Sequence, residues 1–266
     1  MEYFDEEKVR SLLTWEALIP AVERALIDLS LGKIQQPVRS ILRVAEHDGI
    51  FALMPAVDGD LMGVKLVTFY EKNTTQPTHQ AVIQLLSAKT GEPLVAMDGR
   101  LITEMRTAAV SALATRLFAR KDARVLAILG SGVQARSHLR ALRIVRDFPE
   151  VRVWSRTPEH AYTFASEFDL TYAETPEKAV RGADVVVSVA ATREPVSYTH
   201  LDVYKRQTRP VDRAILPVAG GRGAALNAAP DRRSTAVGAV SNHRCGTAGA
   251  VRRRGAGILA SLAVIA

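Results

Sequence analysis

Residues 125–135 read VLAILGSGVQA, and this stretch decides the fold. Its first five residues are apolar and predict a short buried strand, after which two glycines open a helix. Gly130 permits a tight turn, Gly132 lets a phosphate approach the backbone, and Ala135 allows the helix to pack closely on the strand. The pattern G-x-G-x-x-A between a strand and a helix predicts the pyrophosphate-binding turn of a nicotinamide-dinucleotide domain.

Beyond this turn, short apolar runs alternate with helical segments. Such alternation predicts a parallel sheet with right-handed crossovers, covered by helices on both faces. The expected fold class is therefore α/β with a Rossmann-type doubly wound parallel sheet. We expect strands over residues 125–129, 151–155 and 185–189, the last of these ending the sheet, and helices over 134–146, from Thr157-Pro158 and from Thr175-Pro176.

The residues after the second expected strand bear on the choice of cofactor. About 20 residues beyond the glycines, an acidic side chain would bind the ribose hydroxyls of NADH. The sequence has Ser155, Arg156 and Thr157 there instead. A guanidinium beside two hydroxyls suits a 2′-phosphate, so NADPH is favoured over NADH. The alternative is that Arg156 is a solvated loop charge and that Thr157 only caps the next helix.

The first hundred residues have a different pattern. Residues 5–32 have helical periodicity, with Thr14 as a candidate N-cap. Residues 35–98 are β-rich runs separated by turn signals, which predicts an antiparallel meander. A helix rich in alanine follows over 103–119, with Thr103 as its expected N-cap. We therefore expect an N-terminal α+β domain ahead of the Rossmann-type one.

The positive charge of the chain is concentrated at one end. Residues 1–196 carry a net charge of −1, whereas residues 208–266 carry +7. Nucleic-acid binding is therefore disfavoured. Residues 197–266 also have few large side chains and no amphipathic period, so we expect an atypical segment that is disordered or artefactual. Because it would not complete the parallel sheet, we expect the chain as written to be poorly stable or inactive.

Three other features limit the class of protein. The single cysteine, Cys245, excludes an intrachain disulfide and a cysteine-cluster metal site, and it favours the cytoplasm. The six histidines show no metal-ligand spacing, so no metal is expected. No apolar run approaches the roughly 18 residues of a membrane span, so no membrane partner is expected.

Several strings in the first 196 residues are recognisable together. They are QPVRS at 36–40, LMPA at 53–56, KLVTFYE at 65–71, PTHQA at 77–81, MDGRLITEMRTAAVSALAT at 97–115, LGSGVQA at 129–135 and VWSRT at 153–157. This part of the chain resembles the ornithine cyclodeaminase/mu-crystallin family, most of all its mu-crystallin branch. The resemblance implies a homodimer, with a substrate-binding and dimerisation domain over 1–110 and a partial NAD(P)-binding Rossmann domain over 111–196.

The resemblance also implies which residues act. Arg39, Lys65 and Arg106 would surround the substrate, with a guanidinium gripping a carboxylate and Lys65 donating a proton to the nascent amine. The residues alone leave open that each is an ordinary surface charge, and that His79 is a half-buried strand histidine rather than an acid. The implied cofactor contacts are Thr78, Arg106, Thr107, Gly130, Ser131, Gly132, Val133, Gln134, Ser155, Arg156 and Thr157.

The implied function is NADPH-dependent reduction of a cyclic ketimine or imino acid, with a hydride delivered to the C=N carbon next to a carboxylate. Two alternatives stay open. One is an ornithine cyclodeaminase, an NAD-dependent ammonia lyase that gives proline, although the aspartate that such enzymes use has no recognisable counterpart in this sequence. The other is a non-catalytic protein of the crystallin type that binds NADPH and a small ligand.

Overall fold

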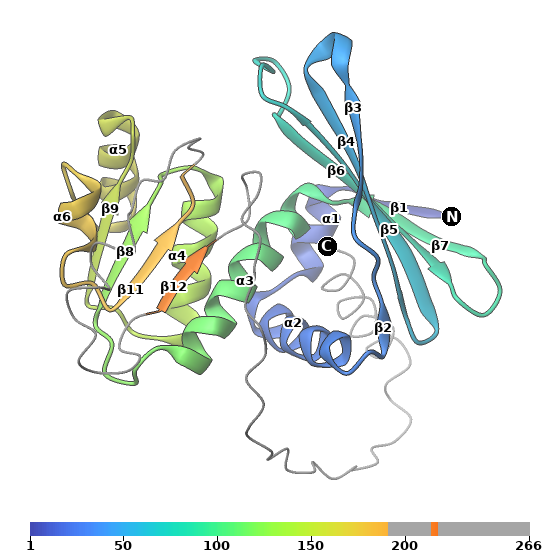
Figure 1. Ribbon diagram of the computed structural model, residues 1–266, viewed down its shortest axis with the longest axis horizontal. Helices are drawn as coiled ribbons and strands as arrows, with labels where there is room; N and C mark the ends of the chain where they lie inside the picture. Colours follow the sequence, from blue (N-terminus) through green and yellow to red (C-terminus); the bar gives the residue numbers. More distant parts are fainter. Residues whose placement is uncertain (191–213, 218–266) are drawn as a thin grey trace.

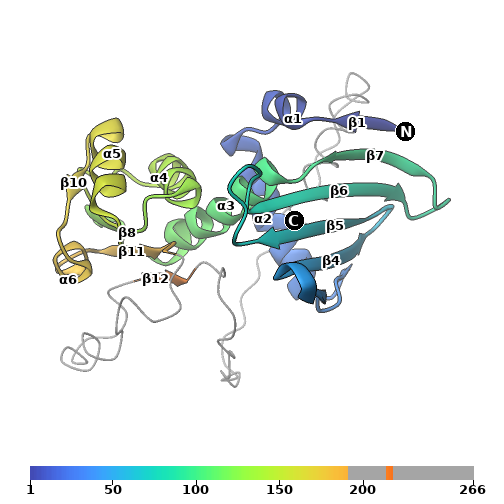
Figure 2. The ribbon, with the colours of Figure 1, turned by 90° about the horizontal axis from the view of Figure 1, so that it is seen from above.

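The computed structural model describes residues 1–190 and 214–217, which form two sheets joined by one long helix (Figure 1). The first sheet has seven strands from residues 2–98, and the second has five strands from residue 125 onward. Helix α3, Arg100–Phe118, lies between the two sheets in both views (Figures 1 and 2). It crosses residue 110, where we placed the boundary between domains, so this helix serves both parts.

The seven-stranded sheet confirms the predicted antiparallel meander. Its order is β1-β7-β6-β5-β4-β2, with β3 also paired to β4. Neighbours from β2 to β7 pair antiparallel, and β1, which no sequence pattern singled out, adds parallel to β7. The strands are β1 (Glu2–Phe4), β2 (Ile34–Gln35), β3 (Ser40–Val44), β4 (Gly49–Asp58), β5 (Leu61–Tyr70), β6 (His79–Ser87) and β7 (Pro93–Asp98), with the short 3-10 helix η1 (Ala45–His47) before β4.

The helical prediction for residues 5–32 is correct in kind but misses a break. Two helices occupy it, α1 (Glu6–Leu12) and α2 (Trp15–Ser30). Thr14 caps α2 as predicted, since its hydroxyl accepts from Ala17 N at 3.4 Å. A second cap, Asp5, starts α1 by accepting from Lys8 N at 2.8 Å, and the chain is extended between the two helices.

Thr103 is not the N-cap that we predicted. Helix α3 begins three residues earlier, at Arg100, with Gly99 as its N-cap. The carboxylate of Asp98, at the end of β7, accepts from Arg100 N at 2.9 Å and so satisfies a free amide of the first turn. The sheet-to-helix corner is therefore tighter than the composition suggested, and Thr103 lies inside the helix.

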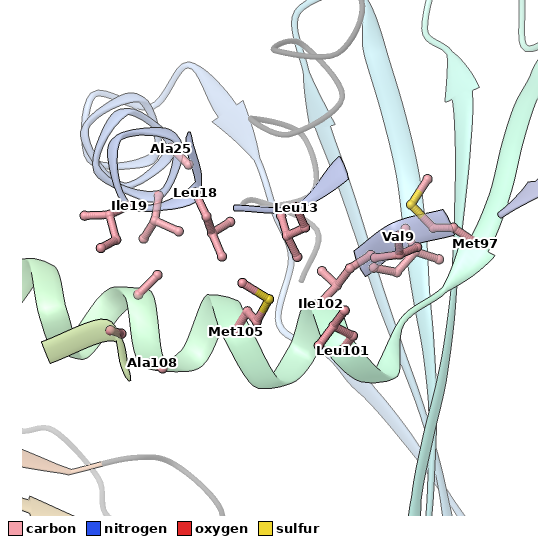
Figure 3. Close-up of a cluster of buried hydrophobic side chains, with 14 of the residues drawn as sticks. Val9, Leu13, Leu18, Ile19, Ala25, Met97, Leu101, Ile102, Met105 and Ala108 are labelled. Atoms are coloured by element: carbon pink, nitrogen blue, oxygen red, sulfur yellow. The ribbon is translucent and has the colours of Figure 1, made fainter. Parts of the chain in front are cut away.

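One continuous apolar core joins the helices to the covered face of the seven-stranded sheet (Figure 3). Helix α3 supplies Leu101, Ile102, Met105 and Ala108 to it, and Met97 comes from β7. Burial of apolar area of this kind is the main driving force for folding. It fixes α3 against the sheet, which positions the polar side chains that α3 also carries.

The five-stranded sheet is fully parallel, as predicted, in the order β10-β9-β8-β11-β12. Alternate residues of β8 pack into two different clusters, Leu126 and Ile128 with α4 and α5, and Ala127 and Leu129 with α6. Both faces are thus covered. The elements are β8 (Val125–Leu129), α4 (Val133–Val145), β9 (Glu150–Trp154), α5 (Pro158–Phe168), β10 (Thr171–Tyr172), α6 (Pro176–Val180), β11 (Val185–Ser188) and β12 (Ala214–Pro217).

The prediction that the strand at 185–189 ends the sheet is wrong. Residues 214–217 form β12, which pairs parallel with β11 from Val185↔Ala214 to Ser188↔Pro217. A short apolar run, AILP, carries this strand inside the segment that we expected to lack structure. The rest of our prediction for residues 197–266 lies outside the described residues. Among the described helices, none has the length and apolar character needed to cross a membrane.

Candidate active site

Lys65 is the most unusual side chain of the seven-stranded sheet. It lies in the middle of β5, opposite Met54 on β4 and Ile83 on β6. Only 1% of it is exposed, and it shares a sheet face with Ile83, which packs in the core beside α3. Burying an ammonium group costs free energy that a solvent-facing strand lysine would avoid. The alternative of a solvated surface lysine is therefore wrong.

The electrostatics of Lys65 are set by burial and by two arginines. Burial lowers the pKa of Lys65 to about 7, and the positive charges of Arg106 and Arg39 contribute to this. The pKa of Arg106, half-buried on α3, is itself lowered to about 10 by burial and by Arg39. Its Nε is buried and has no hydrogen-bond partner in the described part of the chain. A bound anion would relieve this excess of positive charge.

Arg39 and His79 lie near Lys65 and Arg106, but they come from two other parts of the sheet. Arg39 is exposed and immediately precedes β3, and His79 begins β6 and is half-buried. The pKa of His79 is lowered by burial and then by Lys65 and Arg106, so its imidazole is neutral at pH 7. The structure brings the three cations together, since Arg106 and Arg39 lower the pKa of Lys65 and Arg39 lowers that of Arg106. His79 is a half-buried strand histidine, which is one of the two alternatives that the sequence left open. We call Arg39, Lys65 and Arg106 the cation cluster.

The glycine turn has the geometry that its sequence predicts. Gly130 has a φ of +128°, and a Cβ there would lie 3.0 Å from the backbone of Val189. A Cβ on Gly132 would meet nothing within 4 Å, so this side of the turn is open. Helix α4 starts here without a side-chain cap and without an acidic residue in its first turn. Its free N–H groups and the positive end of its dipole suit a phosphate.

Two loops meet beside this turn. Ser131 Oγ donates to Ser155 Oγ at 2.9 Å, which joins the loop after β8 to the loop after β9. Arg156 and Thr157 follow directly and are exposed. Within residues 1–190 and 214–217, Arg156 takes part in no ion pair. The arrangement leaves a guanidinium and hydroxyls available at the end of β9, where the sequence has no acidic side chain.

The other predicted cofactor residues are distributed around the two helices and one loop. Thr78 is exposed before β6, and Thr107 Oγ1 donates to the Thr103 carbonyl at 2.7 Å. Val133 is exposed at the start of α4, whereas Gln134 Oε1 is buried and lacks a partner among the described residues. The hydroxyl oxygen of Thr103 is in the same state. Buried polar atoms are ordinarily hydrogen-bonded, so the oxygens of Gln134 and Thr103 are available to a ligand.

A polar junction that sequence reasoning missed links α3 to α4. Ser137 Oγ donates to Glu104 on α3. His138, fully buried, donates from Nδ1 to the Gln134 carbonyl at 2.7 Å and accepts at Nε2 from Ser111 Oγ at 3.1 Å. Burial lowers the pKa of His138 to about 4, so the ring stays neutral. The small residues of α3 were the only signal of this close helix pair.

No group of histidine, cysteine and acidic side chains able to hold a metal ion occurs among the residues that the structure describes. The candidate site consists of three parts. They are the cation cluster around β5 and α3, the glycine turn at the start of α4, and the polar junction between α3 and α4. The first can bind an anion and hold a proton on Lys65, and the second can bind a pyrophosphate.

Comparison with known proteins shows which family has this arrangement. Residues 3–203 match the model of the ornithine cyclodeaminase/mu-crystallin family. The chain is 43% identical over 202 residues to the ketimine reductase mu-crystallin of Mus musculus, which covers 73% of this chain and 64% of the relative. The chain thus spans less than two thirds of the length of that protein.

Two solved structures are similar in fold. The Delta(1)-pyrroline-2-carboxylate reductase of Thermococcus litoralis, in complex with NADH and L-proline, aligns with a TM-score of 0.70 and 34% identity over 74% of this chain and 64% of its own. An archaeal alanine dehydrogenase dimer with bound NAD aligns with a TM-score of 0.70 and 32% identity, over 74% of this chain and 62% of its own. The family match covers most of the chain, from β1 to β11, so the chain belongs to the ornithine cyclodeaminase/mu-crystallin family.

Proposed function

We propose that this chain carries the site of an NADPH-dependent reductase of cyclic ketimines or imino acids, an oxidoreductase acting on C=N bonds. The observation that carries the proposal is Lys65, a buried amine with a pKa of about 7 beside Arg106 and Arg39. At neutral pH such an amine exists in both protonation states, as a general acid requires.

The cation cluster suits a substrate with a carboxylate next to an imine. Arg106 and Arg39 would bind the carboxylate and so fix the orientation of the C=N bond. Lys65 would donate its proton to the imine nitrogen, which becomes the amine of the product. The dihydronicotinamide, when bound, supplies the hydride that the imine carbon receives. Of the similar structures, that of the Thermococcus reductase is described with NADH and L-proline, which supports a carboxylate beside a ring nitrogen.

The residues around α4 fit a dinucleotide. Gly130 permits the tight turn, Gly132 leaves the helix N-terminus open, and Gln134 offers a buried oxygen without a partner among the described residues. Val133, Thr78 and Thr107 would flank the nicotinamide half. At the other end, Ser131, Ser155, Arg156 and Thr157 would hold the adenosine, and Arg156 is the reason to propose NADPH rather than NADH.

We also propose a homodimer in the cytoplasm. One face of the seven-stranded sheet is covered by helices, whereas the other presents half-buried or exposed apolar side chains on its central strands. These include Phe51 and Leu53 on β4, Val64 and Leu66 on β5, and Val82 on β6. A second copy would bury this face. Size-exclusion chromatography with light scattering should give twice the chain mass, and a monomer at micromolar concentration would exclude the dimer.

Binding and turnover are tested separately. Since the core of the parallel sheet is closed on both faces, we expect the 266-residue chain to bind NADPH, in contrast to our expectation from the sequence. Fluorescence titration of NADPH measures this, and a chain that binds neither NADPH nor NADH would contradict the proposal.

Turnover is measured as NADPH oxidation with Δ1-pyrroline-2-carboxylate or Δ1-piperideine-2-carboxylate. The assay uses the chain and a chimera that continues after residue 196 with the corresponding part of the mouse relative, because the chain spans 64% of that protein. We expect the chimera to be the faster form. If neither form oxidises NADPH with these imines, the proposed reductase function is wrong. Release of proline and ammonia from ornithine without net use of cofactor would instead favour the cyclodeaminase.

A further inference from the structure

Arg136 is a cation at a position where a helix disfavours one. It is the fourth residue of α4, whose first turn has no acidic side chain to balance the positive end of the helix dipole. A cation there repels the dipole and would also attract any anion bound at the turn. Other contacts of Arg136 must therefore offset the free-energy cost of this repulsion.

Three contacts hold the guanidinium in one orientation. Nη1 donates to the Ser131 carbonyl at 2.6 Å, and Nη2 donates to the carboxylate of Glu167 on α5, also at 2.6 Å. The guanidinium carbon lies 4.9 Å from the centre of the Phe164 ring. With 27% of the Arg136 side chain exposed, the group is wedged between α4 and α5. The fork geometry of arginine allows both hydrogen bonds at once.

The bond to Ser131 has a consequence for the next amide. The described chain has no cis peptide, so the Ser131 carbonyl and the Gly132 N–H point in opposite directions across one planar unit. Because the carbonyl is turned toward Arg136, the Gly132 N–H is turned away from it. This N–H has no partner in the described part of the chain, and the space around Gly132 is open.

We propose that Arg136 is a positioning residue of the pyrophosphate site, which holds the Ser131 carbonyl and thereby aims the Gly132 N–H at the phosphate. The inference rests on the proposed function, since it takes a dinucleotide as the ligand. Glu167 and Phe164 keep the arginine in place, and Glu167 also balances its charge. The second loop contact, from Ser131 Oγ to Ser155 Oγ, fixes the same residue from the other side.

The test measures dissociation constants of the full chain for NADPH and for 2′-AMP, which has the adenosine and 2′-phosphate but no pyrophosphate. Arg136→Met keeps the apolar stem and loses both hydrogen bonds. It is expected to weaken NADPH binding about tenfold and 2′-AMP binding by less than about twofold. Arg140→Met is the matched control, because Arg140 stacks on Phe168 one turn further along α4, at 5.6 Å from the ring centre. It should leave both constants unchanged.

Circular dichroism and thermal unfolding establish that each variant is folded. If Arg136→Met does not fold, Arg136→Lys replaces it. A lysine can donate to the Ser131 carbonyl, but it lacks the second nitrogen with which arginine also binds Glu167. Arg136→Lys should weaken NADPH binding about threefold. Unchanged NADPH binding in the folded variant, or equal weakening of NADPH and 2′-AMP, overturns the inference. Failure of the unsubstituted chain to bind NADPH and NADH overturns the proposed function and the inference with it.

Discussion

The two halves of the site are built in opposite ways. The glycine turn uses consecutive backbone groups between β8 and α4, and its geometry follows from residues 130–135 themselves. The cation cluster uses Lys65 from β5, Arg106 from α3 and Arg39 from the segment before β3. Its chemistry arises from burial and from charges that lie far apart in sequence. A local motif therefore predicts its own function, whereas the pKa of Lys65 is a property of the folded chain.

The largest effect should come from removing the amine of the cation cluster. Lys65→Met is expected to lower NADPH oxidation with the imine by about 100-fold to 10,000-fold, because a general acid contributes a factor of that order. NADPH binding should be unchanged, since the turn is separate from the cluster. Turnover is measured in the faster of the two assay forms and binding by fluorescence. Turnover retained at the original rate would remove Lys65 from the mechanism.

The next effect concerns the adenosine end of the turn. Arg156→Ala should reduce the preference for NADPH over NADH by about 10- to 100-fold, because a charge-assisted hydrogen bond to the 2′-phosphate is lost. The ratio of the two dissociation constants is the measurement. Arg124→Ala serves as control, since Arg124 is exposed and precedes β8 at the opposite end of the strand. An unchanged ratio in Arg156→Ala would mean that Arg156 is a solvated loop charge that does not bind the 2′-phosphate.

Two glycines of the same turn should respond differently. Gly130→Ala places a side chain at a φ of +128° and 3.0 Å from Val189, so it should lower the free energy of unfolding by about 1–3 kcal/mol. Gly132→Ala has an ordinary φ of −80° and open space, so stability should hold while NADPH binding weakens about tenfold. Denaturant unfolding and titration separate the two outcomes. Equal effects on stability would contradict this division of roles.

The last effect is a pH dependence of stability, which Lys65 sets. Its pKa in the folded chain is about 7, below the value of 10.5 that is usual for a lysine in water. Between these values the unfolded chain binds more protons, so the free energy of unfolding should rise with pH, by at most about 1.4 kcal/mol per pH unit. Urea denaturation across this range measures the slope, and Lys65→Met should abolish it. A slope that persists in the variant belongs to other groups.

Much of the fold could be predicted because it follows local rules. Apolar runs predicted the central strands of both sheets, β4 to β7 and β8, β9 and β11, and Thr14 and Thr175 cap helices as their sequence context suggests. The prediction failed where a distant contact decides the structure. Helix α3 starts early because Asp98 satisfies its first turn, and β12 forms because it can pair with β11.

The site divides along the same line. Gly130, Ser131 and Ser155 could be placed from the motif alone. The burial of Lys65 could not, because an isolated strand lysine ordinarily keeps its head in solvent. Nor could the junction of His138 with Ser111, or the bond from Arg136 to Ser131, since both depend on how helices pack against one another and against the turn.

The pH profile of kcat/KM for imine reduction tests the central claim most directly, because the claim is that Lys65 donates the proton from a pKa of about 7. The protonated amine is the active form, so kcat/KM should be level below that pKa and fall about tenfold per pH unit above it. Lys65→Met should lose this limb together with most of the rate. A profile that stays flat to about pH 9, or the same falling limb in the variant, would contradict the assignment of Lys65 as the acid.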